Sequence, residues 1–250
     1  MRALIIAAGF GSRLGGPDAS KPLALLQGVP LIEHVIRRAQ AGGVTDFVVV
    51  TGHHAERVER FLHSLSNRIG IPIATVRTND WSLPNGHSVL SGLPALGGSG
   101  LLMMADHLFD PGNIARLIAG VDPAAALSLG VDRRLGNPLV DPADVTRVCT
   151  DSQGHITAIG KEIAPWDAHD TGLFHVTPML AEALAACIAS KGSASLTHGV
   201  QYLAAQGLAQ AIDLGEGWWM DVDTPADLAA AAREMADSVS KEGERNASVV

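Results

Sequence analysis

Short apolar runs alternate along the chain with segments in which apolar residues recur every three or four positions. The short runs, bounded by glycine or polar residues, predict buried strands, and the recurring pattern predicts helices with one apolar face. Strands are predicted at residues 3–8, 47–51, 73–76, 100–105 and 124–131. Helices are predicted at residues 30–41, 55–65 and 88–96, and from residue 114 onward. This alternation predicts an α/β fold around a largely parallel sheet.

The pattern changes in the second half of the chain. The turn residues Asp151-Ser-Gln-Gly154 separate two short strands, residues 146–149 and 155–159, and together they predict a β-hairpin. A strand at 171–176 and helices at 178–190 and 197–206 are expected to follow, then a strand at 209–214 and an apolar stretch at 218–223.

The end of the chain combines a well-marked helix start with a polar tail. Pro225 begins the last predicted helix, with Thr224 as its N-cap and Asp227 in its first turn. Residues 236–250 are small and polar, and we expect them to be disordered. Without a repeat or a low-complexity linker before this tail, residues 1–235 are expected to form one domain.

The composition is that of a globular protein. Of the 250 residues 47% are hydrophobic, which is enough for a sizeable buried core. The formal net charge of −8 argues against nucleic acid and anionic membrane surfaces as partners, because both are polyanions. A small anionic substrate held by local cations and a metal is compatible with this charge. The sequence leaves a homodimer open.

Three features bear on the compartment. Cys149 and Cys187 form no CxxC pair and no zinc-ligand spacing, which suits a reducing environment. Residues 81–105 lack charged side chains, but prolines, glycines and polar residues interrupt them, so we expect no membrane insertion. The apolar run at the start of the chain is too short for a signal peptide. We therefore expect a cytoplasmic protein.

The most distinctive motif is Ala7-Ala-Gly-Phe-Gly-Ser-Arg-Leu14, followed by Ser20-Lys-Pro-Leu23. Two glycines after a strand let the backbone approach a ligand closely and direct N–H groups toward an anion. Arg13 and Lys21 add two cations beside them. A tight turn between a strand and a helix would use the same glycines. The spacing matches neither a dinucleotide-binding fingerprint nor a P-loop.

Residues 7–14, Lys21-Pro-Leu23 and Gly28-Val-Pro-Leu-Ile32 together resemble the amino-terminal signature of nucleotidyltransferases with the glycosyltransferase-A type fold. The resemblance implies a single three-layer α/β/α domain with a mostly parallel mixed sheet. It also implies that the glycine loop lines the nucleotide and that the two cations neutralise the triphosphate during catalysis. The nucleotide-binding residues implied here are Ala8, Gly9, Gly11, Ser12, Arg13 and Lys21.

Further motifs occur in the order found in CTP:inositol-1-phosphate cytidylyltransferases, over roughly residues 1–235. They are Thr51-Gly-His-His-Ala-Glu56, Asn79-Asp-Trp81, Asn85-Gly-His-Ser88, Met104-Ala-Asp-His107, Ile159-Gly-Lys161, Asp170-Thr-Gly172 and Asp221-Val-Asp-Thr-Pro225. The resemblance implies transfer of a cytidylyl group from CTP to inositol 1-phosphate, a small phosphorylated polyol, with release of pyrophosphate. Such enzymes are often fused to a membrane-embedded phosphotransferase, and we expect this chain to lack that second activity.

Two other functions stay open from the sequence. The acceptor could be another small phosphate or phosphonate, such as phosphocholine or aminoethylphosphonate, or a sugar phosphate used with a different nucleotide. The domain could also sense nucleotides without turnover. Retention of Arg13, Lys21, Asp106 and Asp223 together argues against a sensor, because a sensor does not need a metal pair.

Two carboxylates are candidates for a metal site. Asp106 directly follows a predicted strand, at the edge where α/β sheets hold their ligands, and Asp223 ends an apolar stretch before a helix. Asp106 could instead cap a turn, and Asp223 could support the cap at Thr224. Mg²⁺ takes few protein carboxylates and leaves its other positions to phosphate and water. The resemblance assigns Mg²⁺ to the same pair, with Asp221 as a more distant neighbour.

Base recognition is expected in the loop before the helix at 88–96. The amide of Asn85 and the hydroxyl of Ser88 can pair with the edge of a base, and Gly86 permits close approach. Asn79 is a further candidate for nucleotide binding. A turn followed by a helix start would account for the same residues.

The acceptor site is implied by resemblance alone. It contains His107, Lys161, Asp170, Thr171 and Gly172. An ammonium is a compact point charge and suits the acceptor phosphate, although a solvated surface lysine is the alternative for any single lysine. His107 is the histidine expected nearest to the chemistry.

Overall fold

The computed structural model describes residues 1–14 and 19–247. The strands are β1 (Arg2–Ala7), β2 (Leu25–Leu26), β3 (Val29–Pro30), β4 (Asp46–Thr51), β5 (Ile73–Arg77), β6 (Gly100–Met104), β7 (His107–Phe109), β8 (Leu127–Asp132), β9 (Arg147–Thr150), β10 (Ile156–Gly160), β11 (Ala168–Val176), β12 (Ala209–Asp213) and β13 (Trp219–Asp221). The helices are α1 (Leu31–Ala41), α2 (Ala55–Ile69), α3 (Asn85–Leu96), α4 (Gly112–Gly120), α5 (Met179–Lys191), α6 (Leu196–Ala204) and α7 (Pro225–Ala247), with short 3₁₀ helices at Ser12–Leu14 and Lys21–Leu23.

One mixed sheet forms the centre of the molecule, in the strand order β10-β9-β11-β6-β1-β4-β5; β8 pairs with β11, and β12 pairs with β8. The four strands β6, β1, β4 and β5 are parallel, and Ile5 of β1 lies between Met103 and Val49. β11 runs antiparallel to β6 and β8, and β9 and β10 form the predicted antiparallel hairpin. The predicted α/β class with a mostly parallel mixed sheet is confirmed.

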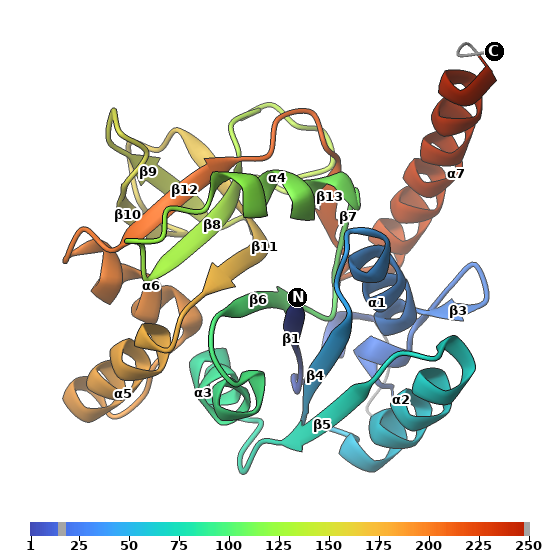
Figure 1. Cartoon of the computed structure of the whole chain (residues 1–250), viewed down its shortest axis with the longest axis horizontal. Coiled ribbons are helices and arrows are strands. Elements are labelled where there is room, and N and C mark those ends of the chain that lie inside the picture. Colours follow the sequence, from blue (N-terminus) through green and yellow to red (C-terminus); the bar gives the residue numbers. More distant parts are fainter. Residues whose placement is uncertain (15–18, 248–250) are drawn as a thin grey trace.

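Alternate residues of β1 point to opposite faces of the sheet, so this strand contributes to two cores. Leu4 and Ile6 belong to a core shared with α3, α5 and α6. Ala3 and Ile5 belong to a second core shared with α1, α2 and α4. Figure 1 shows the same division, with α3 and α5 on one side of the central strands and α1 and α2 on the other. The domain therefore has three layers.

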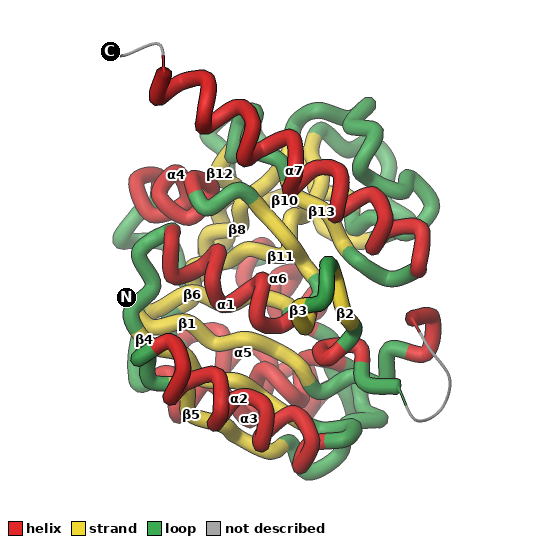
Figure 2. The backbone as a smooth tube through the Cα atoms, turned by 90° about the vertical axis from the view of Figure 1, so that its right-hand side faces the viewer, coloured by secondary structure: helices red, strands yellow, loops and turns green. Residues whose placement is uncertain are grey.

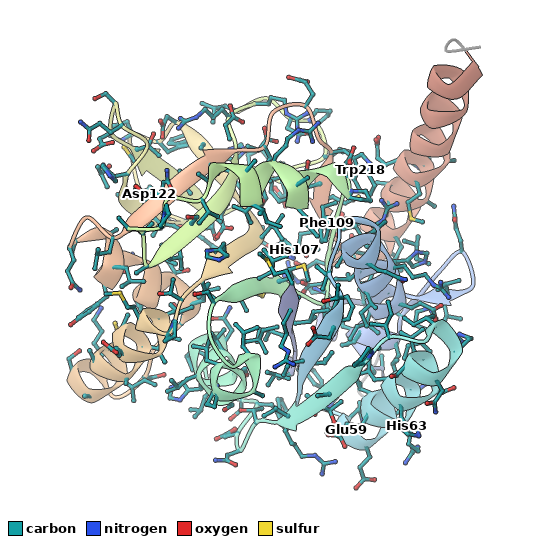
Figure 3. All side chains as sticks on the ribbon, viewed as in Figure 1. Glu59, His63, His107, Phe109, Asp122 and Trp218 are labelled. Carbon is teal, nitrogen blue, oxygen red and sulfur yellow. The ribbon has the colours of Figure 1, made fainter. Side chains whose placement is uncertain are left out.

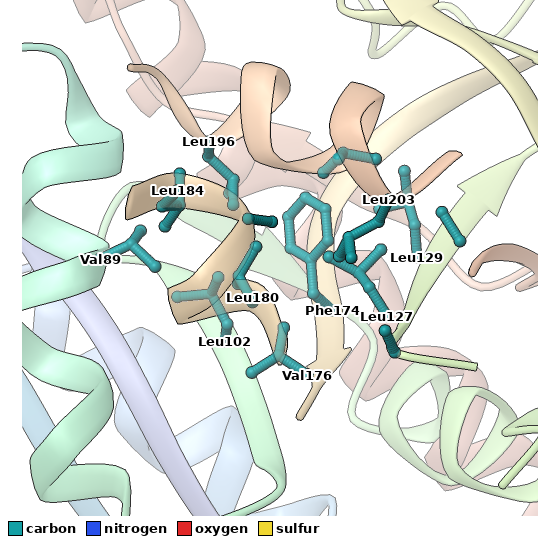
Figure 4. Packing of buried hydrophobic residues seen from close by; sticks show 14 of the residues in the cluster. Val89, Leu102, Leu127, Leu129, Phe174, Val176, Leu180, Leu184, Leu196 and Leu203 are labelled. Carbon is teal, nitrogen blue, oxygen red and sulfur yellow. The ribbon is translucent and has the colours of Figure 1, made fainter. Parts of the chain in front are cut away.

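Phe174 of β11 lies at the centre of the first core. Its ring packs among leucines of β8, α5 and α6, among them Leu129, Leu180 and Leu203 (Figure 4), and the residue is 1% exposed. Burial of a phenylalanine side chain contributes about 2–3 kcal/mol. This packing fixes β11, the strand that also carries Asp170.

β7 and β13 form a separate antiparallel ribbon beside the sheet. Asp221 lies opposite His107, and the N–H of Val222 donates to the carbonyl oxygen of Asp106 at 3.0 Å. The hydrophobic pattern does not predict β7, because a three-residue strand carries too little periodicity. The ribbon brings the chain around Asp221 beside the end of β6.

The segment Asn85-Gly-His-Ser88 is helical, whereas the sequence predicts a loop. α3 begins at Asn85, directly after Pro84. Pro84 has φ −52° and ψ 148°, so the chain is extended up to this residue and turns into the helix at the next one. The candidate base-reading residues therefore lie on the first turn of a helix.

α7 begins as predicted but extends farther. The N–H of Thr224 donates to Asp227 Oδ2 at 2.7 Å and the N–H of Asp227 donates back to Thr224 Oγ1 at 3.3 Å, which forms a reciprocal cap. The helix continues to Ala247, through most of the segment expected to be a disordered tail. Alanine, which favours helix, is frequent between residues 226 and 236, and no proline follows Pro225 to end the helix.

Figures 1 and 2 both show α7 extending away from the body of the molecule. None of the helices within residues 1–14 and 19–247 is both long and apolar enough to cross a bilayer. Residues 248–250 of the expected tail lie outside the described residues. The domain boundary at residue 235 stays a prediction.

The buried carboxylate of Asp132 connects the end of β8 to β13. Asp132 is 1% exposed and accepts hydrogen bonds from Trp219 Nε1 at 2.9 Å, Asn137 Nδ2 at 2.7 Å and Arg134 Nε at 2.8 Å. Burial alone would raise the pKa of Asp132, but these hydrogen bonds outweigh it and lower the pKa. The charged form of Asp132 therefore stabilises the fold and the position of β13.

We expect Asp132→Ala to lower the free energy of unfolding by about 2–4 kcal/mol at pH 7, because Trp219 and Arg134 lose a buried partner. Asp132→Asn keeps the shape and should cost less. A lowered native pKa means that the charge stabilises the fold above the unfolded pKa of about 4 and that this contribution is lost as the pH falls through the native pKa. Urea denaturation of wild type and Asp132→Asn should therefore show a stability difference that shrinks on acidification, and a difference independent of pH would contradict the role of the charge.

Candidate active site

The candidate residues converge where β1 and β6 end. Parallel strands place their carboxyl ends at one edge of a sheet, which is where α/β folds bind ligands. The glycine loop follows β1, and Asp106 follows β6 after one residue. The β7–β13 ribbon adds His107 and Asp221 at the same edge and leads to Asp223.

Two adjoining cavities open at this edge. The smaller, of about 280 Å³, is lined by the glycine loop, including Gly9 and Gly11, and by Lys21. The larger, of about 480 Å³, is lined by residues from the ribbon, the hairpin, α3, α6 and β11. Of the predicted acceptor residues it contains His107, Lys161, Asp170 and Gly172. Both cavities share Arg13, Asp106 and Asp223, so charged groups lie between them.

The buried ammonium of Lys21 connects three carboxylates. Its Nζ donates to Asp106 and to Asp223 and lies 3.8 Å from Asp221 Oδ1. The side chain is 10% exposed. Burial opposes the charge on Lys21, but the carboxylates of Asp106 and Asp221 outweigh it and raise the pKa. Lys21 is therefore charged at neutral pH.

Gly11 permits this position of Lys21. Its φ of +61° lies in the left-handed region, and a Cβ added to Gly11 would lie 2.3 Å from Cβ of Lys21. Any side chain at this position would displace the lysine. The second glycine of the motif is thus required by the position of Lys21.

Arg13 connects the two cavities. Nη2 donates to Asp223 at 2.6 Å, and Nη1 donates to Asp144 at 2.9 Å. Lys161 donates to the other oxygen of Asp144. Cations and carboxylates therefore alternate from the larger cavity to the smaller one. Asp144 lies in no distinctive sequence motif, so the sequence alone does not identify it as a site residue.

His107 is held as a cation between carboxylates. Nδ1 lies 2.9 Å from Asp106 Oδ1 and 3.7 Å from Asp221 Oδ1. Burial opposes protonation, but the charges of Asp221 and Asp106 outweigh it and raise the pKa of His107 to about 9. Gly172, with φ +74°, makes room for the ring, because a Cβ there would lie 2.3 Å from it. Figure 3 shows His107 near the middle of the molecule, whereas Glu59 and His63 lie at the periphery on α2.

The carboxylates of this cluster differ in their pKa values. Burial opposes ionisation of Asp106, but hydrogen bonds and charge from His107 and Lys21 outweigh it and lower the pKa. Burial raises the pKa of Asp221, and the negative charge of Asp106 adds to this effect. Burial also raises the pKa of Asp170, to about 6.

The donor set fits a hard divalent cation. Asp106, His107 and Asp221 each offer an atom within 4.8 Å of the others. Oδ1 of Asp221 is buried and has no hydrogen-bond partner among the described residues. Oxygen is the ligand type that Mg²⁺ prefers, so the carboxylate oxygens of Asp106 and Asp221 are the suitable ligands in this group. Asp223 lies beside them, because Lys21 donates to both Asp106 and Asp223. Asp221 is the last residue of β13 and is separated from Asp223 by a single residue, and this Asp-x-Asp spacing is its sequence signal.

The first turn of α3 packs against α6 and against the residues that precede α6. Oδ1 of Asn85 accepts a hydrogen bond from the N–H of Leu196 at 2.8 Å, and Asn85 lines the larger cavity. Gly86 is buried where α3 meets Ala194. Both residues therefore fix the contact between α3 and α6, beside the cavity.

Three predicted residues lie away from the cavity walls. Ser88 is 3% exposed and is not among the residues that line either cavity. Oγ1 of Thr171 donates to the carbonyl oxygen of Gly130 at 2.7 Å, on the face of β11 opposite its neighbours. Asn79 is exposed after β5. The structure does not bring these three side chains together with the charged cluster.

Three predicted residues of the glycine loop remain to be placed: Ala8, Gly9 and Ser12. Ala8 is 2% exposed, and its carbonyl oxygen accepts from the N–H of His53 at 2.9 Å. Gly9 lines the smaller cavity. The side chain of Ser12 lies outside the described part of the structure.

Comparison with known proteins agrees with this geometry. A family model described as a MobA-like NTP transferase domain matches residues 3–198. The bifunctional IPC transferase and DIPP synthase of Rubrobacter xylanophilus is 34% identical over 230 residues, which are 90% of this chain and 50% of that protein. The chain thus spans about half the length of this curated relative.

Two solved structures are similar to this chain over most of its length. The inositol-1-phosphate CTP transferase from T. maritima has a TM-score of 0.83 and 26% identity, with 94% of each chain covered. A UDP-glucose pyrophosphorylase complexed with UDP-glucose has a TM-score of 0.79 at 18% identity, covering 95% of this chain and 98% of that chain, and shares the fold. These matches confirm the resemblance expected from the motifs.

We expect Gly11→Ala to lower nucleotidyl transfer, measured as pyrophosphate release, by roughly tenfold or more, because a displaced cation no longer meets the phosphates. Gly70→Ala is the matched control: its φ of +68° carries the same backbone strain, but the space around its Cβ position is open. Thermal unfolding should show that both variants fold, with the larger shift in Gly11→Ala, because its added Cβ also displaces a buried, ion-paired lysine. Equal activity of the two variants would show that Lys21 is not displaced.

Proposed function

Because the chain belongs to the family of MobA-like NTP transferase domains, we propose that it transfers a cytidylyl group from CTP to inositol 1-phosphate, giving CDP-inositol and pyrophosphate. The observation that carries the proposal is the pair of adjoining cavities with cations and carboxylates between them. The names of the Rubrobacter relative and of the T. maritima structure support this choice of nucleotide and acceptor. Free Cys149 and Cys187 fit a cytoplasmic location.

The smaller cavity is the proposed donor site. The glycine loop gives the triphosphate close access to the backbone, and Lys21 and Arg13 supply positive charge beside it. Asn85 and Gly86, at the start of α3, stay predicted contacts for the nucleoside; Asn85 lines the larger cavity, and Gly86 is buried against Ala194. The roles of Asn79, Ser88 and Ser12 in nucleotide binding stay predictions.

The larger cavity is the proposed acceptor site. Lys161 would hold the acceptor phosphate, and Asp170 would accept hydrogen bonds from the polyol hydroxyls. An oxygen of this phosphate attacks the α-phosphorus of CTP in line, and the bond to the β-phosphate breaks. The attacking oxygen is already anionic, so no general base is needed.

Asp106 and Asp223, with Asp221 beside them, would hold Mg²⁺, which when bound neutralises and orients the phosphates. Lys21 and Arg13 keep these carboxylates in place through direct hydrogen bonds. Catalysis by this chain then rests on positioning and on charge complementarity.

A pyrophosphate-release screen tests the proposal. CTP, UTP, ATP and GTP are each combined with inositol 1-phosphate, phosphocholine, aminoethylphosphonate and glucose 1-phosphate. We expect turnover with CTP and inositol 1-phosphate and a product with the mass of CDP-inositol, because a site that hydrogen-bonds one base leaves buried polar groups unpaired with another. Equal use of UTP, or a purine preference, contradicts the donor assignment. Turnover with CTP and a different acceptor contradicts only the assignment of inositol 1-phosphate as the acceptor.

We expect Asp106→Ala and Asp223→Ala each to reduce turnover by about two or more orders of magnitude at saturating Mg²⁺, since each removes a carboxylate from the cluster around Lys21. Asp213→Ala, at an exposed position at the end of β12, is the control and should keep wild-type rates. Circular dichroism and thermal unfolding check that the variants fold. Near-normal activity of either variant removes that residue from the proposed metal site.

A further inference from the structure

Asp144 lies between two cations on the wall of the larger cavity. Oδ2 accepts from Nη1 of Arg13 at 2.9 Å, and Oδ1 accepts from Nζ of Lys161. The two cations come from distant parts of the chain, the glycine loop and the turn after β10. One carboxylate group therefore fixes the separation between a group at the donor cavity and a group at the acceptor cavity.

The backbone holds Asp144 in place independently of these cations. Asp141 opens a turn in which its carbonyl oxygen accepts from the N–H of Asp144 at 3.2 Å and of Val145 at 3.0 Å. Oδ1 of Asp141 accepts from the N–H of Ala143 at 2.9 Å. This turn fixes the backbone position from which the Asp144 side chain extends, in the segment between β8 and β9.

The cations are far less constrained on their own. The side chains of Arg13 and Lys161 are 57% and 55% exposed, whereas that of Asp144 is 32% exposed. Long, exposed side chains sample many rotamers, and ordering them costs free energy on binding. Hydrogen bonds from Lys161 and Arg13 lower the pKa of Asp144 to about 2, so the carboxylate is charged at neutral pH.

We propose that Asp144 is a positioning residue that holds the ammonium of Lys161 beside the guanidinium of Arg13, so that the acceptor phosphate binds next to the donor triphosphate. The proposal rests on the function proposed above. Asp144 does not saturate either cation: an ammonium has three N–H donors and a guanidinium has five, and one of each points to Asp144. Donors remain for a phosphate group, and the trio keeps a net positive charge.

A double-mutant cycle with Lys161 tests the proposal. We expect Lys161→Ala to raise the KM for inositol 1-phosphate strongly and to leave the KM for CTP nearly unchanged. Asp144→Ala should raise the KM for inositol 1-phosphate by about fivefold, the scale expected for a half-exposed ion pair, and the KM for CTP by less, because Arg13 keeps its contact with Asp223. In the Lys161→Ala background, Asp144→Ala should add less than about twofold, since the residue acts through Lys161.

Two variants serve as controls. Asp144→Glu keeps the charge and should recover part of the lost affinity. Asp46→Ala breaks an ion pair with Arg2 at the opposite end of β1, where Asp46 is 26% exposed, and should leave both KM values unchanged. Thermal unfolding of each variant checks that the fold is retained.

The outcomes separate the alternatives. A fall in the KM for inositol 1-phosphate in Asp144→Ala would show that the carboxylate competes with the substrate and would overturn the proposal. A full fivefold effect in the Lys161→Ala background would overturn it too. Absence of wild-type turnover would instead contradict the proposed function. In that case calorimetry with inorganic phosphate still tests Asp144, because the same loss of affinity is expected without turnover, and unchanged phosphate binding would overturn the proposal.

Discussion

The ion cluster around the buried ammonium of Lys21 is the interaction on which the arrangement of the site depends. Asp106 follows β6, whereas Asp221 and Asp223 come from the region of β13, more than a hundred residues later. Three carboxylates brought this close would repel one another and would lose hydration, and a buried cation offsets both costs. The β7–β13 ribbon carries Asp221 and leads to Asp223, and both carboxylates thereby lie beside the lysine for which Gly11 leaves room.

The fold follows from the sequence wherever an element is long enough to show its period. The apolar run of β1 and the helical faces of α1 and α2 are recognisable because each buries one or two complete faces. β7 cannot be recognised from the sequence, because three residues are too few to show a period. Its position depends on pairing with β13. The start of α3 is missed because Pro84 provides no polar cap.

Some residues of the candidate site can likewise be predicted from the sequence, and others cannot. Motifs beside strand ends identify Arg13, Lys21, Asp106 and Asp223, because a strand end fixes where the next side chains lie. Asp144 cannot be identified from the sequence, since its partner Arg13 lies 131 positions away and nothing local distinguishes it from other acidic loop residues. For Thr171 the sequence did contain a usable signal: if Asp170 and Gly172 face the cavity, strand alternation places the residue between them on the other face.

The alternation of charges explains how a chain with a net charge of −8 can serve a polyanion. The lysine and arginine side chains at the edge, those of Lys21, Arg13 and Lys161, are each in contact with a carboxylate. A triphosphate alone would meet the negative cluster of Asp106, Asp221 and Asp223 at short range and be repelled, and low dielectric surroundings strengthen that repulsion. A triphosphate that carries a divalent cation brings its own compensation and also leaves the lysine and arginine donors to the phosphate oxygens. Under the proposed function, the same carboxylates would therefore favour a triphosphate that carries its metal over a bare triphosphate, and the net charge of −8 would disfavour extended polyanions such as nucleic acids.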